Sequence, residues 1–309
     1  MAILVTGAAG LVGRAAVAAL LRQGVEHVRA VVRDPAQVGD LRRLGAKVAL
    51  LDATDPDGLA AAMDGVFTAC SLTGSLWSRP PEGPPAAVVD PAQVFLAAAK
   101  AAGVRRVVVC SPAAVGTPAA ANAHLAAKAE VEHMVAASGL EYAILRCAHV
   151  LGPGARLLGL LTAGAAGPGH PSGAPGREPV LVPGDGHQRV APVWVGDVAD
   201  AIATADNAAE LGGTTWSLAG PTQLTFDELV DAAHGDRVAK RHLGAGGPGG
   251  PAPGLWAGLS EVQIGVLAAD SLGDPALPAP PGLVPASLAE TLARSAGRER
   301  AGLPGRLDG

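Results

Sequence analysis

The chain is poor in aromatic residues and in cysteine. Aromatic side chains make up 3% of its 309 residues, and only one of them, Tyr142, is a tyrosine. The three cysteines, Cys70, Cys110 and Cys147, each lie in an apolar segment that resembles a strand. An odd number of such cysteines favours buried thiols in a reducing cytosol over a disulfide or a thiolate metal site.

Metal-ligand motifs and basic clusters are also lacking. The histidines at 170, 187, 234 and 242 have no cysteine or glutamate at ligand spacing, so we expect no metal site. The net charge is -5, and no run of Lys and Arg marks a surface for nucleic acid or an anionic membrane. We therefore expect a small-molecule substrate and no nucleic-acid partner.

Long apolar runs are missing too. No stretch free of charges and breakers reaches the ~18 residues that a membrane span needs, so we expect no membrane partner. The first predicted strand begins almost at Met1, where a signal peptide would destroy it, and we expect a cytoplasmic protein.

The first thirteen residues carry the strongest pattern. Residues 2–5 form an apolar run typical of a buried parallel strand, and residues 11–22 predict a helix. The turn between them aims backbone N–H groups and the positive end of the helix at one point, where a pyrophosphate can bind. Gly7 permits the tight turn, Gly10 lets the backbone approach phosphates, and Gly13 lets helix and strand pack closely.

The spacing of this turn is Gly-x-x-Gly-x-x-Gly, which differs from the dinucleotide fingerprint Gly-x-Gly-x-x-Gly. An ordinary strand-to-helix turn is the alternative interpretation. The motif follows a predicted strand and opens a predicted helix, and this context favours a dinucleotide site.

Strands and helices alternate through the first half of the chain. This rhythm is typical of βαβ units, so we predict an α/β fold with a doubly wound parallel sheet. The expected strands are 27–32, 47–51, 65–71, 106–111 and 142–146, and the expected helices are 36–44, 57–63, 91–102 and 119–138.

The rhythm decays beyond residue 150. We predict a dinucleotide-binding core over residues 1–150 and a smaller substrate-binding lobe over 151–309, with segments at about 190–210 returning to the core. Strands are expected at 180–182 and 215–218, and helices at 198–207 and 225–233. Thr225 and Glu228 have the spacing of a capping box at the start of the last helix.

Two Gly/Pro-rich loops, at 73–89 and 168–179, interrupt the pattern. The first leaves the carboxyl end of a predicted strand, the edge over which ligands bind in open α/β sheets. Both loops suit the roof of an apolar pocket, and a surface loop is the alternative for the first.

The residues after the second strand decide between NAD and NADP. Arg33 comes first off that strand, and a guanidinium suits the 2′-phosphate of NADP. Asp34 precedes Pro35 and is expected to cap the next helix. NADP(H) is therefore the preferred cofactor, NAD(H) is the alternative, and Arg33 could instead be a solvated surface residue.

Asp52 and Ala53 end the third strand, where an adenine edge would lie, although Asp52 also suits a turn.

Six segments, in this order and spacing, resemble the short-chain dehydrogenase/reductase superfamily, specifically its atypical NmrA-like branch. They are residues 6–13, 28–35, 103–111, 140–146, 195–199 and 218–221, and 282–290 is similar to the family's C-terminal helix entrance. The resemblance implies a Rossmann fold that binds NAD(P)H. The expected cofactor contacts are Thr6, Gly7, Ala9, Gly10, Leu11, Val12, Gly13, Arg33, Asp52, Ala53, Ser71, Leu72, Thr73 and Lys128.

Catalytic members of that superfamily carry a Tyr-x-x-x-Lys pair on the helix after the fifth strand. The lysine shares a helix face with the tyrosine and lowers its pKa, and the tyrosine protonates the carbonyl oxygen. This chain has His124 and Lys128 at those positions. The resemblance implies that Lys128 binds the nicotinamide ribose and that Ser111 hydrogen-bonds a substrate oxygen; a strand-end turn is the alternative for Ser111.

His124 is the candidate for the missing acid, because an imidazole titrates near neutrality and can donate a proton at pH 7. A helix histidine without a role is the alternative. His149 lies in a stretch that lines the substrate side in this family, or it belongs to a structural turn. Asp197 is expected to cap the helix that follows it.

The first functional hypothesis is an NADPH-dependent reductase of a small, conjugated, apolar acceptor, such as a quinone, an enone or a polyketide-type carbonyl. The second is a non-catalytic NADP(H) sensor that controls a partner protein. The third is a non-redox epimerase or cyclase that keeps the cofactor. The chain is expected to be a monomer or a homodimer.

Overall fold

The computed structural model describes residues 1–77, 86–117, 119, 122–162, 179–243 and 259–297. Its centre is a sheet of seven strands in the order β11-β6-β5-β4-β1-β2-β3, and every strand pair in it is parallel. The strands are β1 (Ala2–Thr6), β2 (His27–Val32), β3 (Lys47–Leu50), β4 (Val66–Ser71), β5 (Arg106–Pro112), β6 (Glu141–Cys147) and β11 (Gly213–Leu218). The predicted doubly wound parallel sheet is confirmed.

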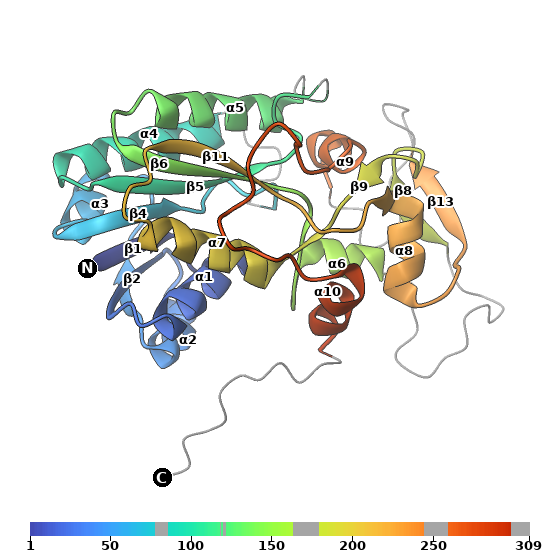
Figure 1. The fold of residues 1–309 in the computed structure, drawn as a ribbon, viewed down its shortest axis with the longest axis horizontal. Helices are drawn as coiled ribbons and strands as arrows, with labels where there is room; N and C mark the ends of the chain where they lie inside the picture. Colours follow the sequence, from blue (N-terminus) through green and yellow to red (C-terminus); the bar gives the residue numbers. More distant parts are fainter. Residues whose placement is uncertain (78–85, 118, 120–121, 163–178, 244–258, 298–309) are drawn as a thin grey trace, which may run out of the picture.

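Helices cover both faces of this sheet (Figure 1). One apolar cluster joins the sheet to α1 (Leu11–Arg22), α2 (Val38–Leu44) and α7 (Val195–Asn207). A second cluster joins the opposite face to α3 (Pro56–Ala62), α4 (Ala86–Ala101) and α5 (Ala123–Ala136). The strand order reverses between β1 and β4, so the crevice expected to bind ligands lies beside the glycine turn.

The starts of two helices, α4 and α5, differ from the prediction by four residues or more. Helix α4 begins at Ala86, five residues before Pro91, within the segment predicted as a loop. Val88 precedes Pro91 and packs against the second cluster, so packing extends the helix past a residue that usually marks its start. Helix α5 begins at Ala123 and not at 119, because Asn122 caps it by accepting a hydrogen bond from the His124 N–H at 3.0 Å.

A single arginine anchors the segment that returns to the core. Arg106 is buried, and its Nη1 donates to the carbonyls of Ala205, Asp206 and Ala208 at 2.9, 2.7 and 2.8 Å. These carbonyls lie at the end of α7, where backbone acceptors lack intrahelical partners. Arg106 Nη2 also pairs with Glu141 at 2.8 Å, so β5, β6 and α7 are joined at one point.

The C-terminal part packs around a third apolar cluster. Its helices and short strands lie beside one end of the central sheet (Figure 1). Thr225 and Glu228 form the predicted capping box of α8 (Phe226–His234). The expected capping role of Asp197 is wrong: Trp194 is the N-cap of α7, and Asp197 accepts a hydrogen bond from the Ala286 N–H at 2.9 Å. The other elements are α6 (Arg156–Leu161), α9 (Glu261–Leu267), α10 (Leu288–Ser295), and the short strands β7 (Val150–Leu151), β8 (Val180–Pro183), β9 (Arg189–Val190), β10 (Val193–Trp194), β12 (Leu224–Thr225) and β13 (Lys240–Leu243).

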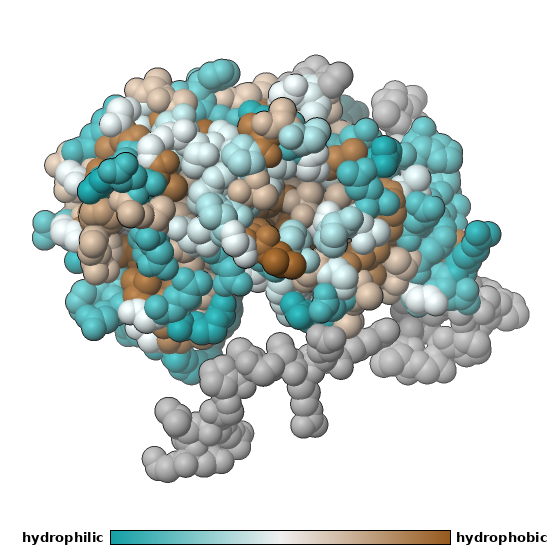
Figure 2. All heavy atoms as spheres, viewed as in Figure 1, coloured by the Kyte–Doolittle hydropathy of each residue, from teal (hydrophilic) through white to brown (hydrophobic). Residues whose placement is uncertain are grey.

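The surface face in Figure 2 is largely hydrophilic, with separate apolar areas between polar side chains. Within the described ranges, no helix has the length and apolar character needed to cross a membrane.

Candidate functional site

The glycine turn between β1 and α1 is closely packed. Gly7 adopts φ +65°, and a Cβ there would lie 2.6 Å from the Leu72 carbonyl oxygen. A Cβ on Gly13 would lie 2.2 Å from the Gly7 oxygen and 2.7 Å from the Ala8 Cα. On Gly10 the nearest atom to a Cβ would be the Gly7 oxygen at 3.2 Å, so the remaining space beside Gly10 is open. The turn thus has room for phosphates at its middle glycine and for no side chain at the other two.

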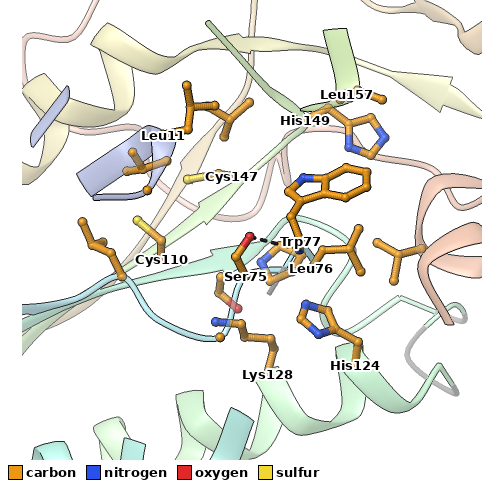
Figure 3. A pocket seen from close by; sticks show the side chains of 18 of the residues that line it. Leu11, Ser75, Leu76, Trp77, Cys110, His124, Lys128, Cys147, His149 and Leu157 are labelled. Atoms are coloured by element: carbon orange, nitrogen blue, oxygen red, sulfur yellow. Dashed lines mark hydrogen bonds between the residues drawn. The ribbon is translucent and has the colours of Figure 1, made fainter. Parts of the chain in front are cut away.

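A cavity of about 240 Å³ opens beside this turn, over the carboxyl ends of β1, β4, β5 and β6. It brings together predicted site residues that lie far apart in the sequence, from Gly7 to His149, which are 142 positions apart. The predicted site residues that line it are Gly7, Gly10, Leu11, Val12, Gly13, Leu72, Thr73, Ser111, His124, Lys128 and His149. Figure 3 shows that Leu11 reaches it from α1, that His124 and Lys128 reach it from α5, and that His149 reaches it from the segment after β6.

The other predicted cofactor residues lie outside the cavity lining, which does not include Thr6, Ala9, Arg33, Asp52, Ala53 and Ser71. Thr6 donates a buried hydrogen bond to the Cys70 carbonyl at 3.2 Å. Asp52 accepts from the backbone N–H and the hydroxyl of Thr54 at 2.9 and 2.8 Å, which is the turn role considered above. These bonds hold the pKa of Asp52 below its usual range, so it is ionised at neutral pH.

Arg33 is exposed at the end of β2. Its side chain is 78% accessible, and its Nη1 lies 3.8 Å from the Asp52 carboxylate. Asp34 caps the short helical turn that starts at Pro35, because its Oδ1 accepts from the Ala36 N–H at 2.9 Å, as predicted. Arg33 therefore keeps donors available to solvent or a ligand, while Asp34 is engaged in the cap.

Lys128 is the charged group at the floor of the cavity. It is 7% exposed, and its Nζ donates to the Thr73 carbonyl at 3.1 Å. In the described part of the chain, no carboxylate oxygen lies within 4 Å of Nζ. Burial lowers the pKa of this ammonium, because removal from water disfavours the charged form. An ammonium has three donors, so two remain for a ligand.

His124 stands one helical turn before Lys128 on α5 (Figure 3). Burial, with a smaller contribution from the Lys128 charge, lowers the pKa of His124 to about 4. The expectation that this imidazole titrates near neutrality is therefore wrong. At pH 7 it is neutral and has no readily lost proton.

Ser111 and His149 provide two polar atoms without a protein partner. Ser111 Oγ and His149 Nε2 are both buried, and neither forms a hydrogen bond with a described residue. The His149 ring packs edge-on against Phe226 at 6.2 Å, and burial lowers its pKa to about 4. Buried polar atoms normally have partners, so both atoms are suited to a ligand that enters the cavity.

The remaining walls are mainly apolar. Their largest members are Leu76, Trp77, Leu157, Val266 and Leu267, and no sequence motif had predicted any of them as a site residue. The predicted loop after β4 was the available signal for Leu76 and Trp77. Nothing in the local sequence marks α9 as part of the site, because it arrives through tertiary packing.

Two side-chain hydrogen bonds hold α9 in place. Gln263 donates to the Leu76 carbonyl at 2.8 Å, and Asn122 donates to the Val262 carbonyl at 2.9 Å. These bonds connect α9 with the loop after β4 and with the start of α5. The second predicted roof loop, at 168–179, lies almost wholly outside the described residues.

All three cysteines are free thiols, as predicted. Cys110 and Cys147 also line the cavity. Hydrogen bonding with Cys110 and burial raise the pKa of the Cys147 thiol. Across the described ranges, no group of three or more His, Cys, Asp or Glu side chains could hold a metal ion.

The comparisons with known proteins agree with this geometry. The model of a family described as NAD(P)H-binding matches residues 7–169. No curated protein matches the sequence.

Several solved structures are similar over nearly the whole chain. The NADPH-dependent quinone oxidoreductase QOR2 from Escherichia coli, complexed with NADPH, is 23% identical with a TM-score of 0.69, covering 94% of this chain and 98% of its own. Triphenylmethane reductase from Citrobacter sp., complexed with NADP(H), is 18% identical with a TM-score of 0.70, covering 96% and 100%. UDP-glucuronic acid 4-epimerase from Bacillus cereus, with UDP-glucuronic acid and NAD, is 18% identical with a TM-score of 0.69, covering 96% and 98%.

At these identities the similar structures show the fold, and they include both reductases and an epimerase. The Rossmann-like fold and the nicotinamide nucleotide as cofactor class are confirmed by the family match and the fold together. The choice between the chemistries depends on the residues of the cavity.

Proposed function

The chain belongs to the NAD(P)H-binding family, and from that premise we propose that it is an NADPH-dependent reductase of a small, conjugated, apolar acceptor. The observation that carries this proposal is the single cavity that joins the glycine turn to Lys128 and Ser111 between apolar walls. Its described lining includes no aspartate or glutamate. A site for an uncharged, apolar acceptor is lined mainly by apolar side chains and needs few charged groups.

The residues around the glycine turn fit a dinucleotide. The N–H groups at the start of α1 would hold the pyrophosphate, because Gly10 leaves open space there. Arg33 would bind the 2′-phosphate, since its guanidinium is exposed and only loosely paired with Asp52. Lys128 would hold the nicotinamide ribose with one of its two remaining donors.

Bound NADPH would supply a hydride to the acceptor. Ser111 Oγ would donate a hydrogen bond to the acceptor oxygen, because it is buried in the cavity without another partner. We assign the proton to the Lys128 ammonium, and not to His124. The ammonium form of Lys128 carries a transferable proton, and burial lowers the pKa of this group, which makes that proton easier to release.

We place the reductase in the cytoplasm, where free thiols such as its three cysteines persist. We keep residues 151–309 mainly as the proposed substrate lobe, with segments at about 190–210 returning to the core, because α6 and α9 supply cavity walls.

Oxidation of NADPH, followed by its absorbance, tests the function across a panel of quinones, enones and ketones. We expect turnover with at least one conjugated acceptor and little with simple ketones. Tight binding of NADPH without oxidation by any member of the panel would contradict the proposal and favour the sensor hypothesis. Conversion of a substrate without net loss of NADPH would favour the epimerase or cyclase hypothesis.

A further inference from the structure

The indole of Trp77 occupies a wall of the cavity opposite Lys128 (Figure 3). Its loop is fixed to other elements at two points, because Lys128 Nζ donates to the Thr73 carbonyl and Gln263 donates to the Leu76 carbonyl. Within the loop, the backbone N–H of Trp77 donates to Ser75 Oγ at 3.2 Å. A side chain on a loop held in this way is a preformed surface for a ligand.

A cation covers the indole from outside the cavity. The Arg156 guanidinium carbon lies 5.3 Å from the centre of the Trp77 ring system, a cation–π contact. Trp77 lines the cavity and Arg156 does not. The contact therefore holds the ring from its outer side, and the remaining surface of the indole is presented to the cavity.

His149 stands beside Trp77 on the same side of the cavity (Figure 3). Its ring is held by Phe226, and its Nε2 is buried without a partner among the described residues. A neutral imidazole with the proton on Nε2 donates one hydrogen bond. Ser111 Oγ is the other unpartnered atom of the lining, and it comes from the end of β5 near Lys128.

We propose that Trp77 and His149 form a recognition wall that selects flat, conjugated acceptors with two polar atoms. The indole lies against the face of the acceptor ring, and His149 Nε2 donates to the polar atom that Ser111 does not bind. This inference rests on the proposed reductase function and assigns its substrate class: ring diones of the quinone type, in preference to enones with a single oxygen.

The charge of the cavity agrees with this class. Arginine, the usual partner of a diphosphate, is absent from the described lining, and Lys128 is the only formal charge there. These features disfavour a nucleotide sugar as the substrate.

Steady-state kinetics with two acceptors test the recognition wall. Tetramethyl-1,4-benzoquinone has two oxygens and no ring position open to thiols, and 2-cyclohexenone has one oxygen. We expect His149→Phe to raise the KM for the quinone about tenfold and to change the KM for the enone less than about twofold. His149→Gln keeps a donor and should recover most of the loss. We expect Trp77→Leu to raise the KM for the quinone about 5- to 10-fold, and Trp77→Phe to restore it.

Two controls distinguish a loss of acceptor recognition from a loss of cofactor binding or of the fold. His133→Gln changes an exposed histidine on α5 and should alter neither KM. The dissociation constant of NADPH should stay the same in every variant, which shows that the fold is intact. Equal effects of His149→Phe on both acceptors, or none on the quinone, would overturn the inference while leaving the reductase function in place.

Calorimetric titration of the NADP⁺-loaded protein with the same quinone gives a second readout that needs no turnover. Binding weakened by both His149→Phe and Trp77→Leu supports the wall, and unchanged binding overturns it. If the wild-type protein oxidises no NADPH with any acceptor, the proposed function fails, and this titration still decides whether the wall binds a quinone.

Discussion

Lys128 Nζ donates a hydrogen bond to the backbone carbonyl of Thr73 over 3.1 Å. This bond joins helix α5 to the loop after β4, two segments that are 55 positions apart in sequence. It leaves a buried ammonium without a carboxylate partner in the described structure, at the point where the glycine turn and the apolar walls meet. Much of the chemistry proposed here depends on that ammonium.

Replacement of Lys128 by Met should separate activity from stability. We expect kcat to fall about 100-fold or more, because the proton source and the ribose donor are lost. The melting temperature should rise by about 2 °C, since a buried cation whose pKa is lowered in the folded state destabilises that state at neutral pH. NADPH oxidation and thermal melts measure the two effects. Lys100→Met, on the exposed face of α4, is the control and should change neither.

The same lowered pKa predicts the direction of the pH profile. Because the ammonium form is the acid, kcat of the wild-type protein should fall as pH rises through the pKa of Lys128, at a pH below the ~10.4 of a free lysine. A profile of kcat that rises with pH over this range would contradict the assignment.

His124→Gln should preserve turnover. The pKa of His124 is about 4, so the imidazole is neutral across pH 6–8 and its replacement removes no acid. We expect kcat/KM within about threefold of the wild-type value and flat between pH 6 and 8. A wild-type inflection near pH 6.5 that disappears in the variant would show that His124 does supply the proton.

His149 should make the protein sensitive to acid. Its pKa is about 4 in the folded state and about 6.5 when unfolded, so between these values the unfolded chain binds the extra proton. Folding stability is therefore lost as pH falls from 6.5 towards 4, on the order of 1–2 kcal/mol at pH 5 for this residue. Urea unfolding at pH 7 and pH 5 measures the loss. His149→Phe should reduce this loss of stability between pH 7 and pH 5. An equal loss in the variant would show that the pKa of His149 is not lowered by folding.

Arg33→Ala should weaken NADPH binding and leave NADH binding nearly unchanged. Loss of a charge-assisted hydrogen bond to the 2′-phosphate corresponds to about 1.5–3 kcal/mol, or roughly 10- to 150-fold in affinity. Fluorescence titration with both nucleotides gives the ratio. Arg105→Ala removes the same charge at the amino end of β5, where Arg105 pairs with Glu141. This variant should leave the preference for NADPH over NADH intact. An unaltered ratio in Arg33→Ala would refute the 2′-phosphate assignment.

Gly13→Ala should abolish NADPH binding and destabilise the fold by more than about 2 kcal/mol. The new Cβ would lie 2.2 Å from the Gly7 oxygen and 2.7 Å from the Ala8 Cα, and both neighbours are backbone atoms that cannot move aside easily. Gly39→Ala is the matched control, because its Cβ would meet nothing within 4 Å inside α2 and should stabilise the protein by roughly 0.5–1 kcal/mol. Urea unfolding and NADPH titration compare the two variants.

Local patterns predicted the sheet and the glycine turn well. Apolar runs such as 27–32 and the break at Gly7 are decided by neighbouring residues, and the structure has β2 and the turn where the patterns put them. The starts of α4 and α5 were missed, because they depend on packing before Pro91 and on the cap made by Asn122. Asp197 was misplaced because its partner, Ala286, is 89 positions away.

By itself, the sequence determined the fold class, the nucleotide-binding turn and the absence of tyrosine at the position of His124. Those features follow from the identity and spacing of residues that are close in the chain. Only the tertiary structure decided that burial lowers the pKa values of His124 and Lys128, and only it brought Trp77, His149 and α9 to one cavity. Burial and long-range contacts set these properties, and neither is a function of local sequence.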